Sequence, residues 1–355
     1  MRYSPALDGV RALSILAVVS FHCGAPWGRG GYLGVDVFFV LSGYLITSLL
    51  MAEHRNGGIR TGAFYARRAL RLYPTLLLMV AAYVVVAPVL WPNEHRWLLA
   101  AFASFYVMDY ALVLGQATKT IGHTWSLGVE EKFYLLWPLL LPLLLRTRRP
   151  LAWLLAAFAC ITAWRYAAAL SWGWLQAYFS FDTRMSGIVL GAMAALAGLH
   201  VSRPVALIAC AVLAFCVACP IMPSLPHYLP IEAVTLELTL AELSAFLLIC
   251  HLAEHDNSGF LASRPMVYVG KLSYGIYLWH FPVAVLLNDA YRQPWWITLT
   301  ATTLFSFAMA ALCLQLVDMP IKRWRGRRSH ESSRLPSRDR EPLPEGFQPL
   351  EGDRT

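Results

Sequence analysis

The sequence contains little charge for its length. Charged residues make up 14% of its 355 residues, whereas a soluble domain typically has about 25%. The formal net charge of +8 comes from Lys and Arg in short segments between apolar runs, as expected for loops of a membrane protein. No basic stripe falls on a soluble domain, so we expect no nucleic-acid partner.

Metal-ligand spacing and a redox context are also missing. The ten histidines are scattered, without the spacing of a metal site, so we predict no metal and no permanently bound cofactor. Cys216 and Cys219 form a C-x-x-C pair, but no βαβ pattern surrounds it. Packing by small, mildly apolar side chains is therefore the favoured interpretation.

Apolar runs of spanning length recur from end to end. Hydrophobic residues make up 58% of the chain, and the mean hydropathy is +0.52. About 20 apolar residues cross a bilayer as a helix. The runs are continuous rather than alternating, so we predict an all-α transmembrane bundle rather than a barrel. The ten expected spans are 8–24, 31–51, 73–91, 127–146, 151–169, 184–200, 204–220, 232–253, 266–288 and 296–318.

The basic segments set the predicted topology. With ten spans and a cytoplasmic N-terminus, all of them fall on the cytoplasmic side, as the positive-inside rule requires. Counting the apolar segment 97–115 as an eleventh span would break this pattern, so we predict an interfacial or re-entrant piece there. Residues 1–325 are expected to form one membrane domain. Residues 326–355, rich in Ser, Pro and charge, are expected to form a disordered cytoplasmic tail.

Ionisable residues inside spans are costly and usually functional. Arg11 and His22 lie on the first span, about 16 Å apart along a helix axis, and a short glycine-rich connection brings Asp36 of the second span to the depth of His22. An imidazole with a carboxylate beside it can act as a general base with its orienting partner. A buried pair that only fixes helix packing is an equally good interpretation of this spacing.

Further polar residues are expected at the same depth, and each has a simpler explanation. Ser126 could be a nucleophile or a helix cap, Glu130 lies near a helix N-terminus where carboxylates are favoured, and Asp182 and Arg184 could form a local salt bridge. The full set expected in this outer half is His123, Trp125, Ser126, Glu130, Asp182 and Arg184.

Two other groups stand out. Arg67, Arg68 and Arg71 could bind phosphate through their guanidinium forks, although arginine-rich cytoplasmic loops are common in any membrane protein. Tyr277 and His280 lie near one face of the ninth span and could line an internal cavity. Glu232, Glu237 and Glu242 lie in or near the eighth span, and the sequence suggests no role for them.

Several long motifs occur in a fixed order: G-V-D-V-F-F-V-L-S-G-Y-L-I-T, R-R-A-L-R-L-Y-P, H-T-W-S-L-G-V-E-E-K-F-Y-L-L-W-P, D-T-R-M and L-S-Y-G-I-Y-L-W-H-F-P. In these motifs the sequence closely resembles the bacterial membrane-bound acyltransferase-3 family over about residues 4–324. Members of that family acylate surface polysaccharides and other glycosides. Val317-Asp318-Met319-Pro320 departs modestly from the Glu-Lys-Pro that usually lies near the end of the domain.

The resemblance implies a multi-pass protein of the bacterial inner membrane that moves a short acyl group, most commonly acetyl, from acyl-CoA to a sugar hydroxyl, for example in lipopolysaccharide. His22, with Asp36 and Glu130, would form the catalytic group. Donor binding would involve Arg11, Arg67, Arg68, Arg71, Tyr277 and His280. The acceptor pocket would include His123, Trp125, Ser126, Asp182 and Arg184. A multi-span transporter or flippase of a lipid-linked glycan is the alternative, which internal repeats or paired broken helices would favour; the sequence shows neither.

Overall fold

The computed structural model describes residues 4–220, 230–255 and 259–323. Within that part the chain is helical and contains no strand, which confirms the all-α prediction. The segment 326–355, for which we predicted a disordered tail, lies outside the described residues.

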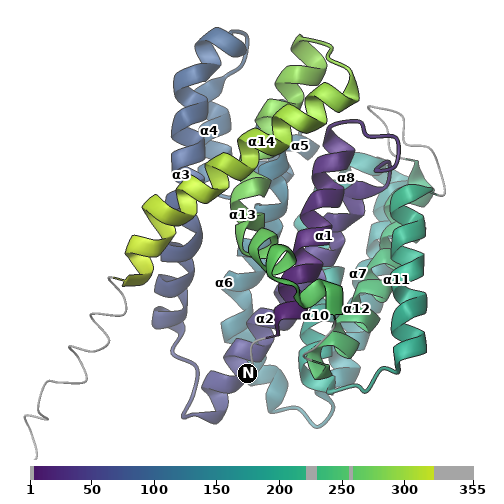
Figure 1. Ribbon diagram of the computed structural model, residues 1–355. Helices are drawn as coiled ribbons and strands as arrows, with labels where there is room; N and C mark the ends of the chain where they lie inside the picture. The colour runs from purple at the N-terminus through teal and green to yellow at the C-terminus, as the bar shows by residue number, and fades with distance from the viewer. Residues whose placement is uncertain (1–3, 221–229, 256–258, 324–355) are drawn as a thin grey trace, which may run out of the picture.

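The long helices follow the predicted spans, with the largest shifts at their ends (Figure 1). They are α1 (Pro5–His22), α2 (Gly34–Arg55), α3 (Thr61–Leu90), α6 (Trp125–Leu145), α7 (Pro150–Trp172), α10 (Ser186–Ala197), α11 (Arg203–Ala218), α12 (Leu238–Glu254), α13 (Arg264–Val285) and α14 (Trp295–Cys313). Helix α3 begins twelve residues before the expected span, so the arginine-rich run is helical rather than a loop. We call the end of the bundle where α1 begins the N-terminal end and the opposite end the far end.

Not every one of these helices meets the requirements for crossing a bilayer. Within the described residues, six helical segments are long and apolar enough: Pro5–His22, Gly31–Arg55, Thr61–Leu90, Pro150–Trp172, Ala233–Glu254 and Trp295–Arg323. Helices α10 and α11 are apolar but shorter, at 12 and 16 residues. Their positions agree with the predicted order of spans, and the number ten stays a prediction.

The segment 97–115 does not form a single long helix. It contains α4 (Arg96–Ser104), which runs beside α3, and α5 (Met108–Val113). Helices of nine and six residues rise about 14 and 9 Å, far less than the roughly 30 Å of a hydrocarbon core. Asp109 on α5 is buried and bonds Lys132 of α6 at 2.8 Å, which holds this piece against the bundle.

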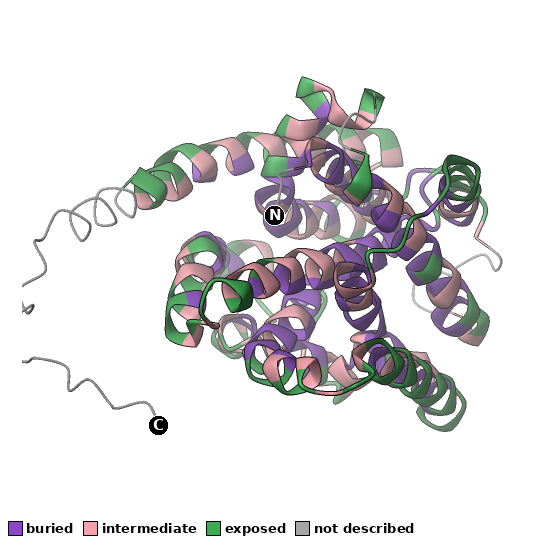
Figure 2. Cartoon of the chain, turned by 90° about the horizontal axis from the view of Figure 1, so that it is seen from below, coloured by how far each residue is buried: buried purple, intermediate pink, exposed green. Residues whose placement is uncertain are grey.

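Burial follows the faces of the helices. Buried residues face the middle of the bundle and exposed ones its periphery (Figure 2). On α6 the stripe Leu135, Leu139 and Leu143 is more than half exposed, and residues four apart share one helix face. A leucine stripe on the outside is what a lipid-facing helix requires, because the bilayer core is itself apolar.

Helices α2 and α10 approach one another closely enough for backbone to meet backbone. A β-carbon on Gly43 would lie 1.9 Å from the carbonyl oxygen of Ile188, and one on Gly191 would lie 2.0 Å from that of Val40. Glycine is therefore required at both positions. Small residues allow this type of packing in membrane helices, where van der Waals contact holds helices together.

Two short helices, α8 (Trp174–Phe179) and α9 (Phe181–Arg184), interrupt the chain before α10. Ser180, Thr183 and Arg184 in this broken stretch are fully buried. Irregular backbone at such depth is tolerated only where protein surrounds it. The interruption places the Arg184 side chain against α2.

Candidate active site

Three histidines from separate parts of the chain meet near the far end of the bundle. His22 ends α1, His123 lies in the short helical turn Gly122–Thr124 (η2), and His280 is on α13. His22 Nδ1 lies 3.0 Å from His280 Nε2, and the ring centroids of His123 and His280 are 5.7 Å apart. We call these three residues the histidine cluster.

The hydrogen bonds of His280 determine the tautomer of His22. His280 Nδ1 lies 2.7 Å from the backbone carbonyl oxygen of Tyr277, so this nitrogen carries the proton and donates. The neutral ring then accepts at Nε2, and the proton between the two rings must belong to His22 Nδ1. His22 Nε2 is left with its lone pair. The ring is also hydrogen-bonded to the backbone of Val18, one turn earlier on α1, and the side chain is partly exposed.

Ser126 and Tyr277 lie beside the cluster. The Tyr277 hydroxyl donates to the His123 carbonyl oxygen at 2.7 Å and lies 2.6 Å from Ser126 Oγ. A phenol has one proton, so Ser126 must donate to the tyrosine oxygen. Ser126 is therefore held by Tyr277 and is not hydrogen-bonded to a histidine. It does not cap α6 either, since the cap position is Thr124.

Asp36 does not pair with His22, contrary to the expected contact. Its Oδ1 forms an ion pair with Arg184 at 2.9 Å, and both side chains are fully buried. The two residues face different helices: His22 faces α13 and Asp36 faces the broken stretch before α10. The partner of His22 is His280, which we had expected on the donor path.

Arg184 also lies among aromatic rings. Its guanidinium carbon is 5.0 Å from the ring centroid of Tyr178, 5.5 Å from Phe39 and 5.6 Å from Trp125. Trp125 is thus a wall of this buried pair. The local Asp182–Arg184 bridge does not form: Asp182 accepts a hydrogen bond from Trp164 Nε1 at 2.6 Å instead.

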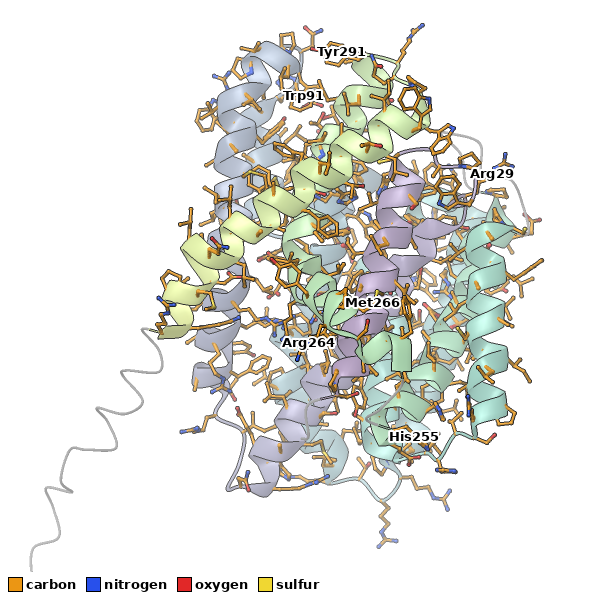
Figure 3. The ribbon with its side chains drawn as sticks, viewed as in Figure 1. Arg29, Trp91, His255, Arg264, Met266 and Tyr291 are labelled. Atoms are coloured by element: carbon orange, nitrogen blue, oxygen red, sulfur yellow. The ribbon has the colours of Figure 1, made fainter. Side chains whose placement is uncertain are left out.

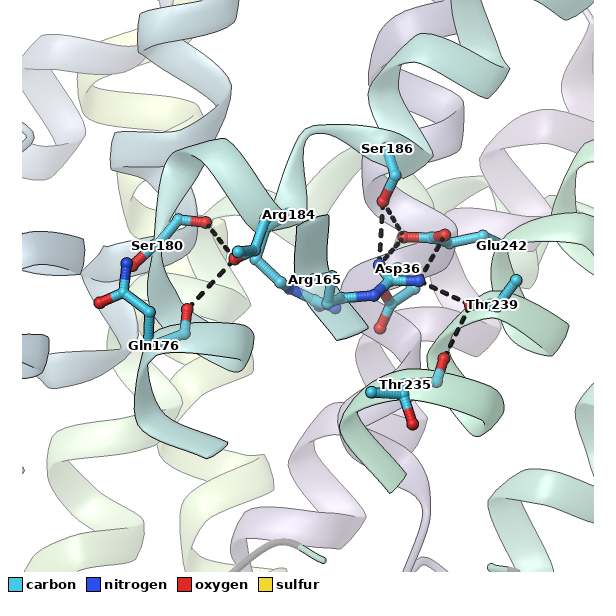
Figure 4. A network of polar contacts seen from close by, with 10 residues as sticks. Asp36, Arg165, Gln176, Ser180, Arg184, Ser186, Thr235, Thr239 and Glu242 are labelled. Atoms are coloured by element: carbon cyan, nitrogen blue, oxygen red, sulfur yellow. Dashed lines mark hydrogen bonds and ion pairs between the residues drawn. The ribbon is translucent and has the colours of Figure 1, made fainter. Parts of the chain in front are cut away.

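A second buried ion pair extends this network (Figure 4). Arg165 of α7 binds Glu242 of α12 at 2.8 and 3.2 Å, and Ser186 donates to the same carboxylate at 2.6 Å. The sequence suggests no role for Glu242, and none of its motifs contains Arg165. An arginine in the apolar run of α7 was the available signal. Glu237 accepts a hydrogen bond from Tyr32 at 2.8 Å, and we find no role for Glu232.

Arginines gather closer to the N-terminal end. Arg68 stacks on Tyr134, its guanidinium carbon 3.7 Å from the ring centroid, and lies 3.6 Å from Glu131 and 4.0 Å from Glu130. Glu130 in turn accepts hydrogen bonds from Ser42 and Tyr134 at 2.9 and 3.1 Å.

Two more arginines lie close to Arg68. Arg11 of α1 and Arg68 both lie near enough to Arg71 to repel its charge. Arg71 is exposed, and the charge of Asp318 acts on it, as that of Arg11 acts on Glu130. Arg67 lies apart and pairs with Glu53. We call Arg11, Arg68 and Arg71 the arginine cluster; such a group favours an anion with several charged oxygens.

The two clusters are connected along α6. Ser126, next to the histidine cluster, and Glu130, next to the arginine cluster, are four residues apart and so lie on one face, about 6 Å apart along the axis. Tyr274 of α13 donates to the Leu72 carbonyl oxygen of α3 at 2.9 Å, which joins α13 to the helix of Arg68 and Arg71. A base-capable nitrogen and a group of arginines therefore lie beside the same helix, α6. Among the described residues, no three His, Cys, Asp or Glu side chains are grouped to hold a metal ion.

This arrangement defines a multi-pass membrane protein with a polar site enclosed by apolar helices. The sequence profile of one family, described as an acyltransferase domain (Acyl_transf_3), matches residues 4–317. The chain therefore belongs to the acyltransferase-3 family.

Curated relatives agree with this assignment. The O-acetyltransferase OatA of Staphylococcus aureus is 30% identical over 368 residues, covering 91% of this chain and 58% of that protein. The putative peptidoglycan O-acetyltransferase YrhL of Bacillus subtilis is 31% identical, covering 90% and 55%, and the peptidoglycan O-acetyltransferase OatA of Listeria monocytogenes is 26% identical, covering 91% and 56%. The chain thus spans little more than half the length of these relatives. No solved structure matches it.

Proposed function

We propose that this protein transfers an acetyl group from acetyl-CoA to a sugar hydroxyl of a cell-wall polysaccharide. The main support is that the histidine cluster, in which His22 Nε2 carries a lone pair, and the arginine cluster lie beside the same helix, α6. The relatives named as peptidoglycan O-acetyltransferases favour a glycan acceptor of that type over lipopolysaccharide. We also propose that the N-terminal end of the bundle faces the cytoplasm.

In this mechanism His22 Nε2 takes the proton of the acceptor hydroxyl while its oxygen attacks the thioester carbonyl carbon. The C–O bond forms, and the C–S bond breaks on collapse of the tetrahedral intermediate. The leaving thiolate then receives the proton from the His22 imidazolium, so the base is regenerated. His280 keeps His22 in the tautomer that has its lone pair at Nε2, the role usually given to a carboxylate.

The arginine cluster would hold the phosphates of the donor. Arg71 is exposed and Arg11 is partly exposed, so a ligand can reach both guanidinium groups. Guanidinium groups bind phosphate oxygens through two parallel hydrogen bonds. Glu130, which we had placed in the catalytic group, lies in this region and would position Arg68.

The test is transfer of radiolabelled acetyl from acetyl-CoA by the full chain in lipid nanodiscs, with soluble peptidoglycan glycan strands and lipopolysaccharide as parallel acceptors. We expect label on the glycan strands, loss of labelling in His22→Ala, and weaker competition by dephospho-CoA than by CoA. Labelling of lipopolysaccharide alone would overturn the proposal that the acceptor is a cell-wall polysaccharide. Absence of labelling with both acceptors would overturn the reaction as proposed.

A further inference from the structure

A separate cavity of about 710 Å³ opens between the end of α3, the start of α4 and the segment 115–118. Its size lies within the roughly 300–1,000 Å³ of ligand pockets. It lies at the far end of the bundle, where Figure 3 labels Trp91. None of the residues of the histidine or arginine clusters lines it.

The lining combines flat aromatic faces with hydrogen-bonding groups. Trp91 and Trp97 provide the rings, and Glu94, Gln116 and Thr118 provide polar atoms. Trp97 is 68% exposed. Apolar rings beside a few polar groups are the usual lining of a ligand pocket.

The walls of this cavity are held rigidly. Glu94 accepts hydrogen bonds from Tyr83 at 2.7 Å, from Thr118 at 2.6 Å and from Thr120 at 2.5 Å. These bonds fix the segment 115–118 to the end of α3. A binding site formed in advance loses less free energy when its ligand is ordered.

The same short segment reaches the histidine cluster. Thr118 precedes His123 by five residues, and a chain spans at most about 3.4 Å per residue. The Cα atoms of the two residues are therefore no more than about 17 Å apart. A polymer held in the cavity therefore has only a short distance to cover to the site of the proposed chemistry.

We infer that this cavity is a binding subsite for sugar units of a polymeric glycan acceptor, away from the unit that is acetylated. The C–H faces of a sugar ring pack on aromatic rings, while its hydroxyls pair with amide and carboxylate oxygens. The inference rests on the proposed function for the nature of the acceptor. The subsite predicts that the protein binds long glycans more tightly than short ones.

Binding can be measured without turnover. We would titrate fluorescently labelled, uncrosslinked peptidoglycan glycan strands onto the His22→Ala protein in nanodiscs, with the labelled disaccharide unit as the short ligand. We expect strands to bind more tightly than the disaccharide. Adding Trp97→Ala or Gln116→Ala should weaken strand binding about tenfold, or about 1.4 kcal/mol, and leave disaccharide binding unchanged.

Trp172→Ala is the matched control, because Trp172 ends α7 at the far end and is 62% exposed. Its loss should not affect strand binding. Equal weakening by Trp97→Ala and Trp172→Ala would assign Trp97 to a general interfacial aromatic belt and overturn the subsite. Strand binding that is absent, or unaffected by both cavity substitutions, would also overturn it. All binding measurements use the His22→Ala protein, so their outcome does not depend on whether the protein transfers acetyl groups.

Discussion

The histidine cluster and the Asp36–Arg184 network are both buried polar groups near the far end of the bundle, but they differ in how their charges are satisfied. In the network each of two carboxylates is paired with an arginine. In the cluster the imidazoles bond one another and backbone carbonyls, and His22 Nε2 keeps an unused lone pair. Position inside an apolar span identifies polar residues that are costly to bury. The hydrogen-bond and ion-pair partners of such a residue then distinguish one that is available for chemistry from one that stabilises packing.

The sharpest test of this distinction is His22→Ala. Loss of a general base costs about 10²–10⁴ in rate, so we expect kcat to fall about 10³-fold while the thermal unfolding midpoint changes little. Acetyl transfer and thermal unfolding in detergent would be measured on the same preparation. His54→Ala, a change at an exposed histidine, should keep full activity. A His22→Ala protein that unfolds early but turns over normally would reverse the assignment.

Breaking the Asp36–Arg184 ion pair should affect stability more than catalytic rate, the opposite of what we expect for His22→Ala. Arg184→Leu leaves Asp36 buried without a partner, and breaking a buried ion pair costs about 3–5 kcal/mol. We expect a large drop in the unfolding midpoint and poor yield. The double variant Asp36→Leu/Arg184→Leu should recover stability, because no charge is left unpaired. If the double variant is stable but lacks activity, the pair has a direct part in catalysis and the comparison fails.

A smaller effect is expected at His280. His280→Ala removes the acceptor that holds the proton on His22 Nδ1, and we expect kcat to fall about 10- to 100-fold, less than for loss of the base itself. His280→Gln offers a side-chain oxygen as acceptor and should restore part of the rate. The pH–rate profile of kcat/KM should also shift, which a purely packing role would not produce. Identical profiles in wild type and both variants would argue against the positioning role.

The smallest effect is expected at the arginine cluster. Arg71→Ala should raise KM for acetyl-CoA about tenfold, equivalent to about 1.4 kcal/mol, with little change in kcat. The same change should matter less with acetyl-dephospho-CoA, which has one phosphate fewer. Arg60→Ala, at an exposed position just before α3, is the control. An equal KM in Arg71→Ala and Arg60→Ala would remove Arg71 from donor binding.

Much of the fold could be predicted from the sequence because lipid imposes one dominant requirement. Long apolar runs must be helices, and the charge of the connections indicated that 97–115 does not cross. Helix ends were less certain, as α3 shows, because a helix can continue beyond the apolar region. The interruption formed by α8 and α9 could not be foreseen, since it depends on surrounding protein to satisfy its backbone.

The sequence predicted which residues belong to the site better than it predicted which of them contact one another. His22 and Asp36 were placed at one depth, yet the rotation of each helix, which sequence spacing between two helices does not specify, gave them different partners. His280 was singled out by its place on a helix face, but its bond to His22 joins residues 258 positions apart in the chain. Arg165 lies inside the predicted span 151–169, and its position there was the signal for a buried ion pair whose partner, Glu242, is 77 residues away in the chain.

The contact of α2 with α10 has a mechanical consequence. Where carbonyl oxygens lie against glycine backbone at Gly43 and Gly191, neither helix can tilt or slide without a collision. Helices α3, α4 and α14 stand at the other side of the bundle, with α14 crossing toward α3 (Figure 1). If the proposed donor enters the protein, we expect the helices to move on the α3 side, where Arg68 and Arg71 lie, while the α2–α10 contact stays fixed.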